Sequence, residues 1–163
     1  MADTRVQKNK VISSDEWYTP KEFIEKLGPF DIDPCAPMNH PYDIAPISYN
    51  KEQDGLAHDW NPDDIVWLNP PYSSKLLYAF CEKLAKHGNG IALLVNRTDN
   101  RLFRDIIFPN AKSMVFLAKR IKFMRPDGSS GYPYFGSVLV AFGEIADIRL
   151  KNCDIAGKYV VLN

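Results

Sequence analysis

The chain has 163 residues, the length of one domain with a core of ordinary size. Lysine plus arginine and aspartate plus glutamate number 20 each, and this zero net charge argues against a broad nucleic-acid footprint, although a local basic patch is compatible with it. No apolar run approaches the roughly 20 residues of a membrane span, and the polar start lacks a signal-peptide core, so we expect a cytoplasmic protein.

The cysteines and histidines are scattered along the chain. The three cysteines form no CxxC pair and have no histidine near them at metal-ligand spacing. This pattern favours neither a structural zinc site nor a disulfide framework, so we expect no metal. The positions are Cys35, Cys81 and Cys153, with His40, His58 and His87.

The first residues differ in character from the rest. Residues 1–14 are polar and lack periodicity, which predicts a mobile N-terminal arm before a single domain over residues 15–163. A short helix is expected next. Thr19 is a candidate N-cap with Pro20 at the first helical position, and Gly28 is a candidate end.

Residues 29–36 alternate apolar and polar types and contain Asp33-Pro34, which predicts a short strand with an acidic residue at its carboxyl end. In open α/β sheets that end faces the ligand crevice, where an aspartate can pair with an ammonium or hydroxyl group. The alternative is an Asx-turn, in which the Asp33 side chain accepts a hydrogen bond from its own backbone segment.

Residues 37–64 are rich in Pro, Asn and Asp and lack a sustained period, which predicts a long loop. A connection of this length inside a compact domain is usually functional. Asp54 and Trp60 could hold a nucleoside, by hydrogen bonding and stacking respectively, although Trp60 could equally belong to the core.

Residues 65–68 form an apolar run that stops at Asn69-Pro70-Pro71-Tyr72, which predicts a short buried strand followed by a rigid loop. The Asn69 amide offers an acceptor, the prolines hold carbonyl groups in fixed directions, and Tyr72 offers a flat face. An exocyclic amine on a planar base needs two acceptors and a stacking surface, so the tetrapeptide suits an amino-methyltransferase. The alternative is a proline turn with an exposed tyrosine.

The rest of the chain alternates between helical and strand patterns. The order strand, helix, strand at these lengths predicts βαβ units and a parallel sheet. Helices are expected at 76–88 and 100–108, strands at 90–96, 112–118 and 137–142, and one or two edge strands within 145–163.

Residues 119–125 concentrate basic side chains, and the flexible loop over 126–136 adds aromatic ones. Basic side chains next to aromatic rings suit phosphate contacts combined with base stacking. The alternative is a solvated turn whose aromatic rings pack back onto the core. The candidate nucleic-acid-binding residues are Lys119, Arg120, Lys122, Arg125, Tyr132 and Tyr134.

Seven segments, in this order, resemble those of the phage-type DNA N6-adenine methyltransferases. They are Trp17-Tyr18-Thr19-Pro20, Asp31-Ile32-Asp33-Pro34-Cys35-Ala36, Asp54-Gly55-Leu56, Asp59-Trp60, Asn69-Pro70-Pro71-Tyr72-Ser73, Arg97-Thr98-Asp99 and Arg120-Ile121-Lys122-Phe123. The tetrapeptide alone is shared with methyltransferases that act on glutamine side chains and on RNA. The ordered combination, which runs from about residue 16 to about residue 142, is more specific.

The resemblance implies an α/β fold with a compact Rossmann-like sheet that binds S-adenosylmethionine, mostly parallel with an antiparallel C-terminal strand. It implies an enzyme that methylates N6 of adenine in DNA after flipping the base, in the cytoplasm of an infected or lysogenic bacterial host. The alternatives are the same chemistry on RNA or on a protein amide, and a catalytically idle nucleic-acid-binding relic. The oligomeric state stays open.

The resemblance also implies roles for individual residues. Asp33 would lie at the methionine end of S-adenosylmethionine, and Asp54 with Leu56 would hold its adenine. Asn69 and the Pro70 carbonyl would accept hydrogen bonds from the target amine. The implied cofactor-binding residues are Thr19, Pro20, Asp33, Pro34, Ala36, Asp54 and Leu56, and the implied catalytic residues are Asn69, Pro70, Pro71 and Tyr72, whose ring would stack on the base.

The chain departs from the methyltransferase pattern in two ways. The usual Gly-x-Gly loop is absent after Asp33, where Cys35-Ala36-Pro37 stands. Asn69 follows Asp33 by only 36 residues, too few for the two strand-helix units that usually intervene. We therefore expect a pared-down sheet without a separate recognition domain, and residues 120–135 are the candidate sequence reader.

Overall fold

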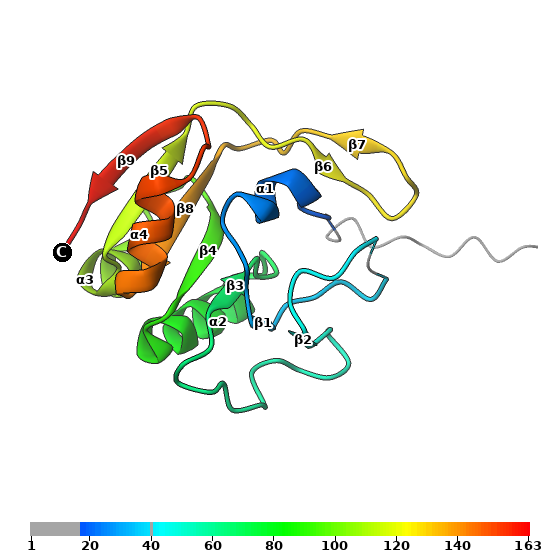
Figure 1. Ribbon diagram of the computed structural model, residues 1–163, viewed down its shortest axis with the longest axis horizontal. Helices are drawn as coiled ribbons and strands as arrows, with labels where there is room; N and C mark the ends of the chain where they lie inside the picture. Colours follow the sequence, from blue (N-terminus) through cyan, green and yellow to red (C-terminus); the bar gives the residue numbers. More distant parts are fainter. Residues whose placement is uncertain (1–16, 40) are drawn as a thin grey trace, which may run out of the picture.

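The computed structural model describes residues 17–39 and 41–163, so the predicted N-terminal arm and His40 lie outside the described part. A central sheet lies between two layers of helices (Figure 1). The helices are α1 (Lys21–Glu25), α2 (Ser74–His87), the π-helix η1 (Phe103–Ile107), α3 (Phe108–Asn110) and α4 (Glu144–Asn152). The strands are β1 (Ile32–Asp33), β2 (Ile47–Ser48), β3 (Val66–Leu68), β4 (Gly90–Val95), β5 (Ser113–Leu117), β6 (Phe123–Met124), β7 (Ser130–Gly131), β8 (Ser137–Phe142) and β9 (Gly157–Val161).

The central sheet has seven strands in the order β2-β1-β3-β4-β8-β5-β9. The ladders β1·β2, β1·β3 and β3·β4 are parallel, whereas β8 is antiparallel to β4 and β5, and β9 is antiparallel to β5. Most strands therefore point the same way, and β8 and β9 point the other way. Strands β6 and β7 form a separate hairpin, which projects beyond the sheet in Figure 1.

The two faces of the sheet bury alternate residues of each strand, as the pleat requires. Val66 and Leu68 pack with α2 and η1 on one face. Trp67, between them in sequence, packs with residues of α1 and α4 on the other face. Strand β3 is thus buried on both sides, which holds the residue that follows it in a fixed place.

The predicted α/β class and the largely parallel direction of the strands are confirmed. The predicted antiparallel C-terminal strand is present as β9, and β8, which lies between β4 and β5, is reversed as well. Antiparallel neighbours need no crossover helix, and a continuous apolar run is compatible with either direction, so the sequence pattern did not distinguish them.

The strand after residue 64 and the helix after it are confirmed. Helix α2 ends before Gly88, whose left-handed φ of 75° fits the predicted C-cap. The predicted strand at 29–36 is shorter than expected, and only its centre, β1, pairs in the sheet. Within the described residues of the segment 37–64, regular structure is confined to β2, so the expectation of a long loop is confirmed.

Helix α4 and the β6–β7 hairpin were not predicted from the sequence. Helix α4 forms where only edge strands were expected. It was missed because Ile145 and Ile148 are exposed, so the helix has only a weak apolar stripe in the sequence. The β6–β7 hairpin forms within the predicted basic segment and loop, and its strands of two residues each are too short to show alternation.

The predicted helix boundaries also need correction. Pro20, not Thr19, occupies the N-cap position of α1, because the Thr19 segment is held extended by the pairing of Tyr18 with Met124. The same helix ends at Glu25, before the predicted end. Pro109 does not end its helix, because it lies in the first turn of α3, where a missing N–H costs little.

Candidate active site at the carboxyl ends of β1 and β3

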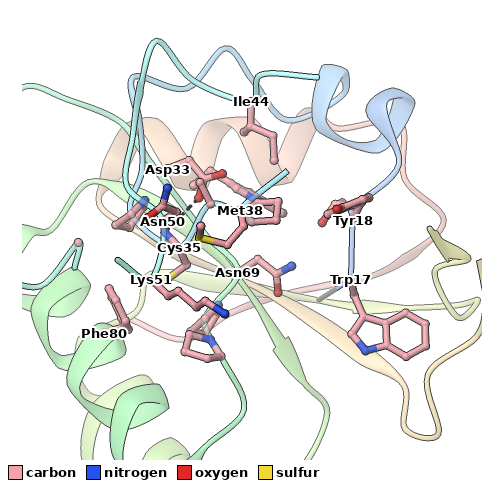
Figure 2. Close-up of a pocket in the computed structure, with 18 of the residues that line it drawn as sticks. Trp17, Tyr18, Asp33, Cys35, Met38, Ile44, Asn50, Lys51, Asn69 and Phe80 are labelled. Carbon is pink, nitrogen blue, oxygen red and sulfur yellow. Dashed lines mark hydrogen bonds between the residues drawn. The ribbon is translucent and has the colours of Figure 1, made fainter. Parts of the chain in front are cut away.

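A cavity of about 550 Å³ opens where β1 and β3 end. The two strands are parallel neighbours, with Ile32 opposite Val66, so the segments that follow them start at the same edge of the sheet. Figure 2 shows Asn69 between Asp33 and Met38 on one side and Tyr18 on the other. The volume lies within the range of roughly 300–1,000 Å³ that small-molecule sites occupy.

Asp33 is a buried carboxyl group in the wall of this cavity. Its side chain is only 2% exposed, and its Oδ1 accepts a hydrogen bond from the Cys35 backbone N–H at 3.2 Å. The Asx-turn considered from the sequence is thus present, in a residue that also lines the cavity. Burial raises the pKa of Asp33 to about 7, although the Cys35 hydrogen bond lowers it in part.

The turn Asp54-Gly55-Leu56 packs against the segment after β1. Asp54 adopts a left-handed φ of 53°, and its Oδ1 accepts a hydrogen bond from the Leu56 N–H at 3.1 Å. A Cβ on Gly55 would lie 2.2 Å from the Pro34 carbonyl oxygen, so only glycine allows this approach. Two segments predicted to bind one cofactor are therefore in direct contact.

Two side chains, Trp60 and Lys83, hold the same turn in place through hydrogen bonds to its carbonyl groups. The Trp60 Nε1–H donates to the Gly55 carbonyl at 3.2 Å, and the Lys83 Nζ donates to the Leu56 carbonyl at 2.9 Å. Trp60 is buried in the core cluster beside α2, so its structural role is the one that the geometry supports. Lys83 lies over the Trp60 ring at 4.8 Å and ties the turn to α2.

Asn69 to Tyr72 form the neighbouring wall of the cavity. Asn69 is half-buried, Pro70 is buried, and Tyr72 is 42% exposed at the rim. Phe80 of α2 lines the same cavity. Asn69, Pro70, Pro71 and Tyr72 thus line one space, and the catalytic roles that the resemblance implies for them stay a prediction.

The segment before α1 closes the opposite side. Trp17, Tyr18 and Thr19 line the cavity, and the Tyr42 hydroxyl donates to the Thr19 carbonyl. Pro20, in contrast, does not line it and caps α1 instead. Of the residues expected to bind the cofactor, those that line the cavity are Thr19, Asp33, Pro34, Ala36, Asp54 and Leu56.

Other lining residues were missed. They come mainly from the loop after β1, and the length of that loop was the one signal that pointed to them. They include Met38, Tyr42, Ile44, Asn50 and Lys51. Polar and apolar residues in a segment without a period cannot be sorted into lining and solvent-facing sets from sequence.

The six candidate nucleic-acid-binding residues lie outside the cavity. All are exposed, and they occupy the β6–β7 hairpin and the segments on either side of it: Lys119, Arg120, Lys122, Arg125, Tyr132 and Tyr134. The Arg125 guanidinium lies over the Trp17 ring at 4.7 Å. This contact joins the hairpin to the wall of the cavity.

Within residues 17–39 and 41–163, no cluster of His, Cys, Asp and Glu side chains is suited to hold a metal ion. Across the same described part, no helix combines the length and apolar character needed to span a membrane. Cys35, Cys81 and Cys153 are free thiols, and burial raises the pKa of the Cys81 thiol to about 12.

The chain is 28% identical over 109 residues to a DNA N-6-adenine-methyltransferase of Escherichia phage T1, a match that covers 63% of this chain and 44% of the relative. The chain thus spans less than half the length of that curated relative. No solved structure matches it. A model of the family "DNA N-6-adenine-methyltransferase (Dam)" matches residues 6–144, most of the sequence, and the chain therefore belongs to that family.

Proposed function

We propose that this chain transfers a methyl group from S-adenosylmethionine to the N6 amine of adenine in DNA, with the target base flipped into the cavity beside Asn69. One observation carries the proposal: the segments that begin at Asp33 and Asn69 line one cavity at the ends of neighbouring parallel strands. Membership of the family and the name of the phage T1 relative support it.

The residues present fit S-adenosylmethionine. The cofactor carries an ammonium group, and Asp33 offers a buried carboxyl group that accepts a hydrogen bond from the Cys35 backbone N–H. The Asp54–Leu56 turn offers polar and apolar contacts for a nucleoside, and Pro34 and Ala36 shape the wall between them. On this proposal the sheet is a compact Rossmann-like cofactor-binding fold.

When bound, the cofactor supplies an activated methyl group on a sulfonium. The chain's own contribution is to hold the amine. The Asn69 side-chain oxygen and the Pro70 carbonyl accept hydrogen bonds from the two N–H groups of the amine. These hydrogen bonds direct the nitrogen lone pair out of conjugation with the ring. Tyr72 stacks on the base, and positioning of this kind supplies much of the acceleration in reactions between bound partners.

Two alternatives have their own support. The zero net charge and the missing glycine loop keep open a catalytically idle relic, although the intact Asn-Pro-Pro-Tyr tetrapeptide argues against it. The Asn-Pro-Pro-Tyr tetrapeptide by itself is also compatible with methyl transfer to RNA or to a protein amide. All three functions predict nucleic-acid or amide contacts near the cavity, so the reaction itself must be measured.

The test is methyl transfer from isotopically labelled S-adenosylmethionine to unmethylated DNA, RNA and protein, followed by mass spectrometry of the products. We expect labelled N6-methyladenine from DNA, and a fall of about 10²-fold or more with Asn69→Ala, since the variant loses an acceptor aimed at the reacting group. Asn152→Ala, at an exposed position of α4, is the matched control and should retain full activity. Equal rates for the native chain and Asn69→Ala would overturn the assignment of the site.

A further inference from the structure

The cavity lies at the edge of the sheet where β3 and β4 end and where β8 begins. Because β8 is antiparallel to β4, the residues that precede β8 lie where β3 and β4 end. The Asn96 N–H, just after β4, donates to the Gly136 carbonyl at 2.8 Å. Two strand spacings separate β3 from β8, which is about 10 Å. Arg97 and Phe135 therefore lie side by side at this edge, and Tyr72 lies on the segment that follows β3.

Four large aromatic side chains at this edge and on the adjoining loop are exposed to solvent. The exposed fractions are 42% for Tyr72, 47% for Phe135, 62% for Tyr132 and 87% for Tyr134. The alternative considered from the sequence, in which the loop's rings pack back onto the core, is therefore wrong for these residues. Apolar surface gathered in this way marks an interaction site more often than it marks chance.

Positive charge accompanies these rings. The Arg97 guanidinium lies 5.5 Å from the Phe135 ring centre, and an Arg120 N–H donates to the Pro133 carbonyl at 3.4 Å. Lys119 and Lys122 lie in the same exposed segment. We name the aromatic edge by its residues: Tyr72, Arg97, Arg120, Tyr132, Tyr134 and Phe135.

We propose that the aromatic edge binds an unpaired stretch of the DNA strand next to the target adenine, so that the chain acts on single-stranded or locally melted DNA in preference to intact duplex. This inference rests on the proposed function, because the flipped base enters the cavity at the same edge. It names the substrate class, which the names of the family and of the phage T1 relative do not give.

The chemistry of the edge favours an unpaired strand over a duplex. In a duplex the base faces are stacked inside, and a protein gains affinity chiefly by neutralising many phosphates. The zero net charge of this chain does not suit that mode. An unpaired strand exposes its base faces, which stack on aromatic rings, while a few basic side chains meet its backbone.

The test measures binding by fluorescence anisotropy, with one labelled oligonucleotide offered as a single strand and as a duplex with its complement. We expect the native chain to bind the single strand about tenfold more tightly. The double variant Tyr134→Ala/Phe135→Ala should lose about tenfold or more in single-strand affinity. Tyr134→Phe, which keeps the ring, should retain it, as should Ile148→Ala at an exposed position of α4.

Duplex binding that equals or exceeds single-strand binding would overturn the inference, as would unchanged single-strand affinity in the double variant. Methyl transfer is measured on the same two oligonucleotides. Efficient methylation of the duplex with no single-strand preference would refute only the proposed role of the aromatic edge. A clear single-strand preference without any methyl transfer would refute only the proposed function.

Discussion

The cavity and the β6–β7 hairpin are built in opposite ways. Around the cavity the backbone is locked by buried contacts: Gly55 fits against Pro34, and Trp60 and Lys83 anchor the turn from below. The hairpin has strands of two residues and carries exposed side chains. The difference suggests a division of work, in which a rigid site aligns donor and acceptor and an exposed element meets the larger substrate.

The two regions are nevertheless joined. Tyr18 pairs with Met124 through two backbone hydrogen bonds, of 2.8 and 3.0 Å, and Trp17 contacts both the Arg125 guanidinium and the Phe123 ring. Because Trp17 and Tyr18 also line the cavity, changes at the hairpin should reach the cofactor site. The predictions below separate effects on one region from effects on both.

The largest effect is expected from Asp33→Asn. Loss of a charge-assisted contact with an ammonium should weaken S-adenosylmethionine binding by about 10- to 100-fold, as measured by calorimetry. Asp63→Asn, at an exposed position, is the control and should leave the affinity unchanged. Equal affinities for Asp33→Asn and the native chain would contradict the assigned role.

Asp33 also predicts a pH dependence of both binding and stability. Since its pKa in the folded chain is about 7, cofactor affinity should rise as pH increases through 7. The folded pKa lies above the unfolded value of about 4, so the folded state holds the proton more tightly and stability falls as pH rises from about 4 to about 7. Asp33→Asn should therefore be more stable than the native chain at pH 8, while it binds cofactor less well. Thermal unfolding at pH 4 and pH 8 measures this, and a variant that is less stable at pH 8 would contradict it.

Gly55→Ala should disturb the rigid region alone. The new Cβ would collide with the Pro34 carbonyl, which costs about 1–3 kcal/mol of stability and displaces the Asp54–Leu56 turn. We expect a lower midpoint of thermal unfolding and about tenfold weaker cofactor binding. Gly136→Ala has no neighbouring atom within 4 Å of the new Cβ and should change neither quantity. Identical behaviour of the two variants would show that the turn is not held as described.

Trp17→Ala tests the connection between the regions. The variant loses the aromatic ring that the Arg125 guanidinium contacts and part of the cavity wall. Both cofactor and single-stranded DNA should therefore bind about three- to tenfold less tightly. Tyr132→Ala, on the hairpin but away from the cavity, should weaken only DNA binding. If Trp17→Ala weakened the binding of only one of the two ligands, the two regions would be independent.

The smallest effect is expected from Lys83→Met. The variant loses hydrogen bonds to the Leu56 and His58 carbonyls, and chemical denaturation should show a loss of about 1–2 kcal/mol. Lys86→Met removes only a surface pair with Glu82 and should be nearly neutral. Equal stability of the two variants would show that Lys83 does not stabilise the Asp54–Leu56 turn.

What the sequence could predict follows from how strongly each residue is constrained locally. The apolar run before Asn69 and the stripe of α2 carry their own periodicity, so β3 and α2 were predictable. Asp33 ends β1 and was predicted to face the ligand crevice, where Asn69 also lies because β1 and β3 are parallel neighbours. The reversal of β8 was not predictable, since its uninterrupted apolar run carries no information on direction.

Contacts between distant segments account for the rest. Tyr42 and Lys51 reach the cavity only because their loop folds back over it, and no local pattern marks that path. Pro20 was expected in the cofactor site because Thr19-Pro20 resembles the family's Thr-Pro segment, but Pro20 occupies the N-cap position of α1 and does not line the cavity. The pairing of Tyr18 with Met124 joins residues far apart in sequence and has no sequence signal.

One cavity is proposed to serve both donor and acceptor, and a crystal structure with S-adenosylhomocysteine would test this. We expect the ligand's ammonium within hydrogen-bond distance of the Asp33 carboxylate, its adenosine against the Asp54–Leu56 turn, and its sulfur facing Asn69. A ligand bound elsewhere, or one whose sulfur points away from Asn69, would contradict it.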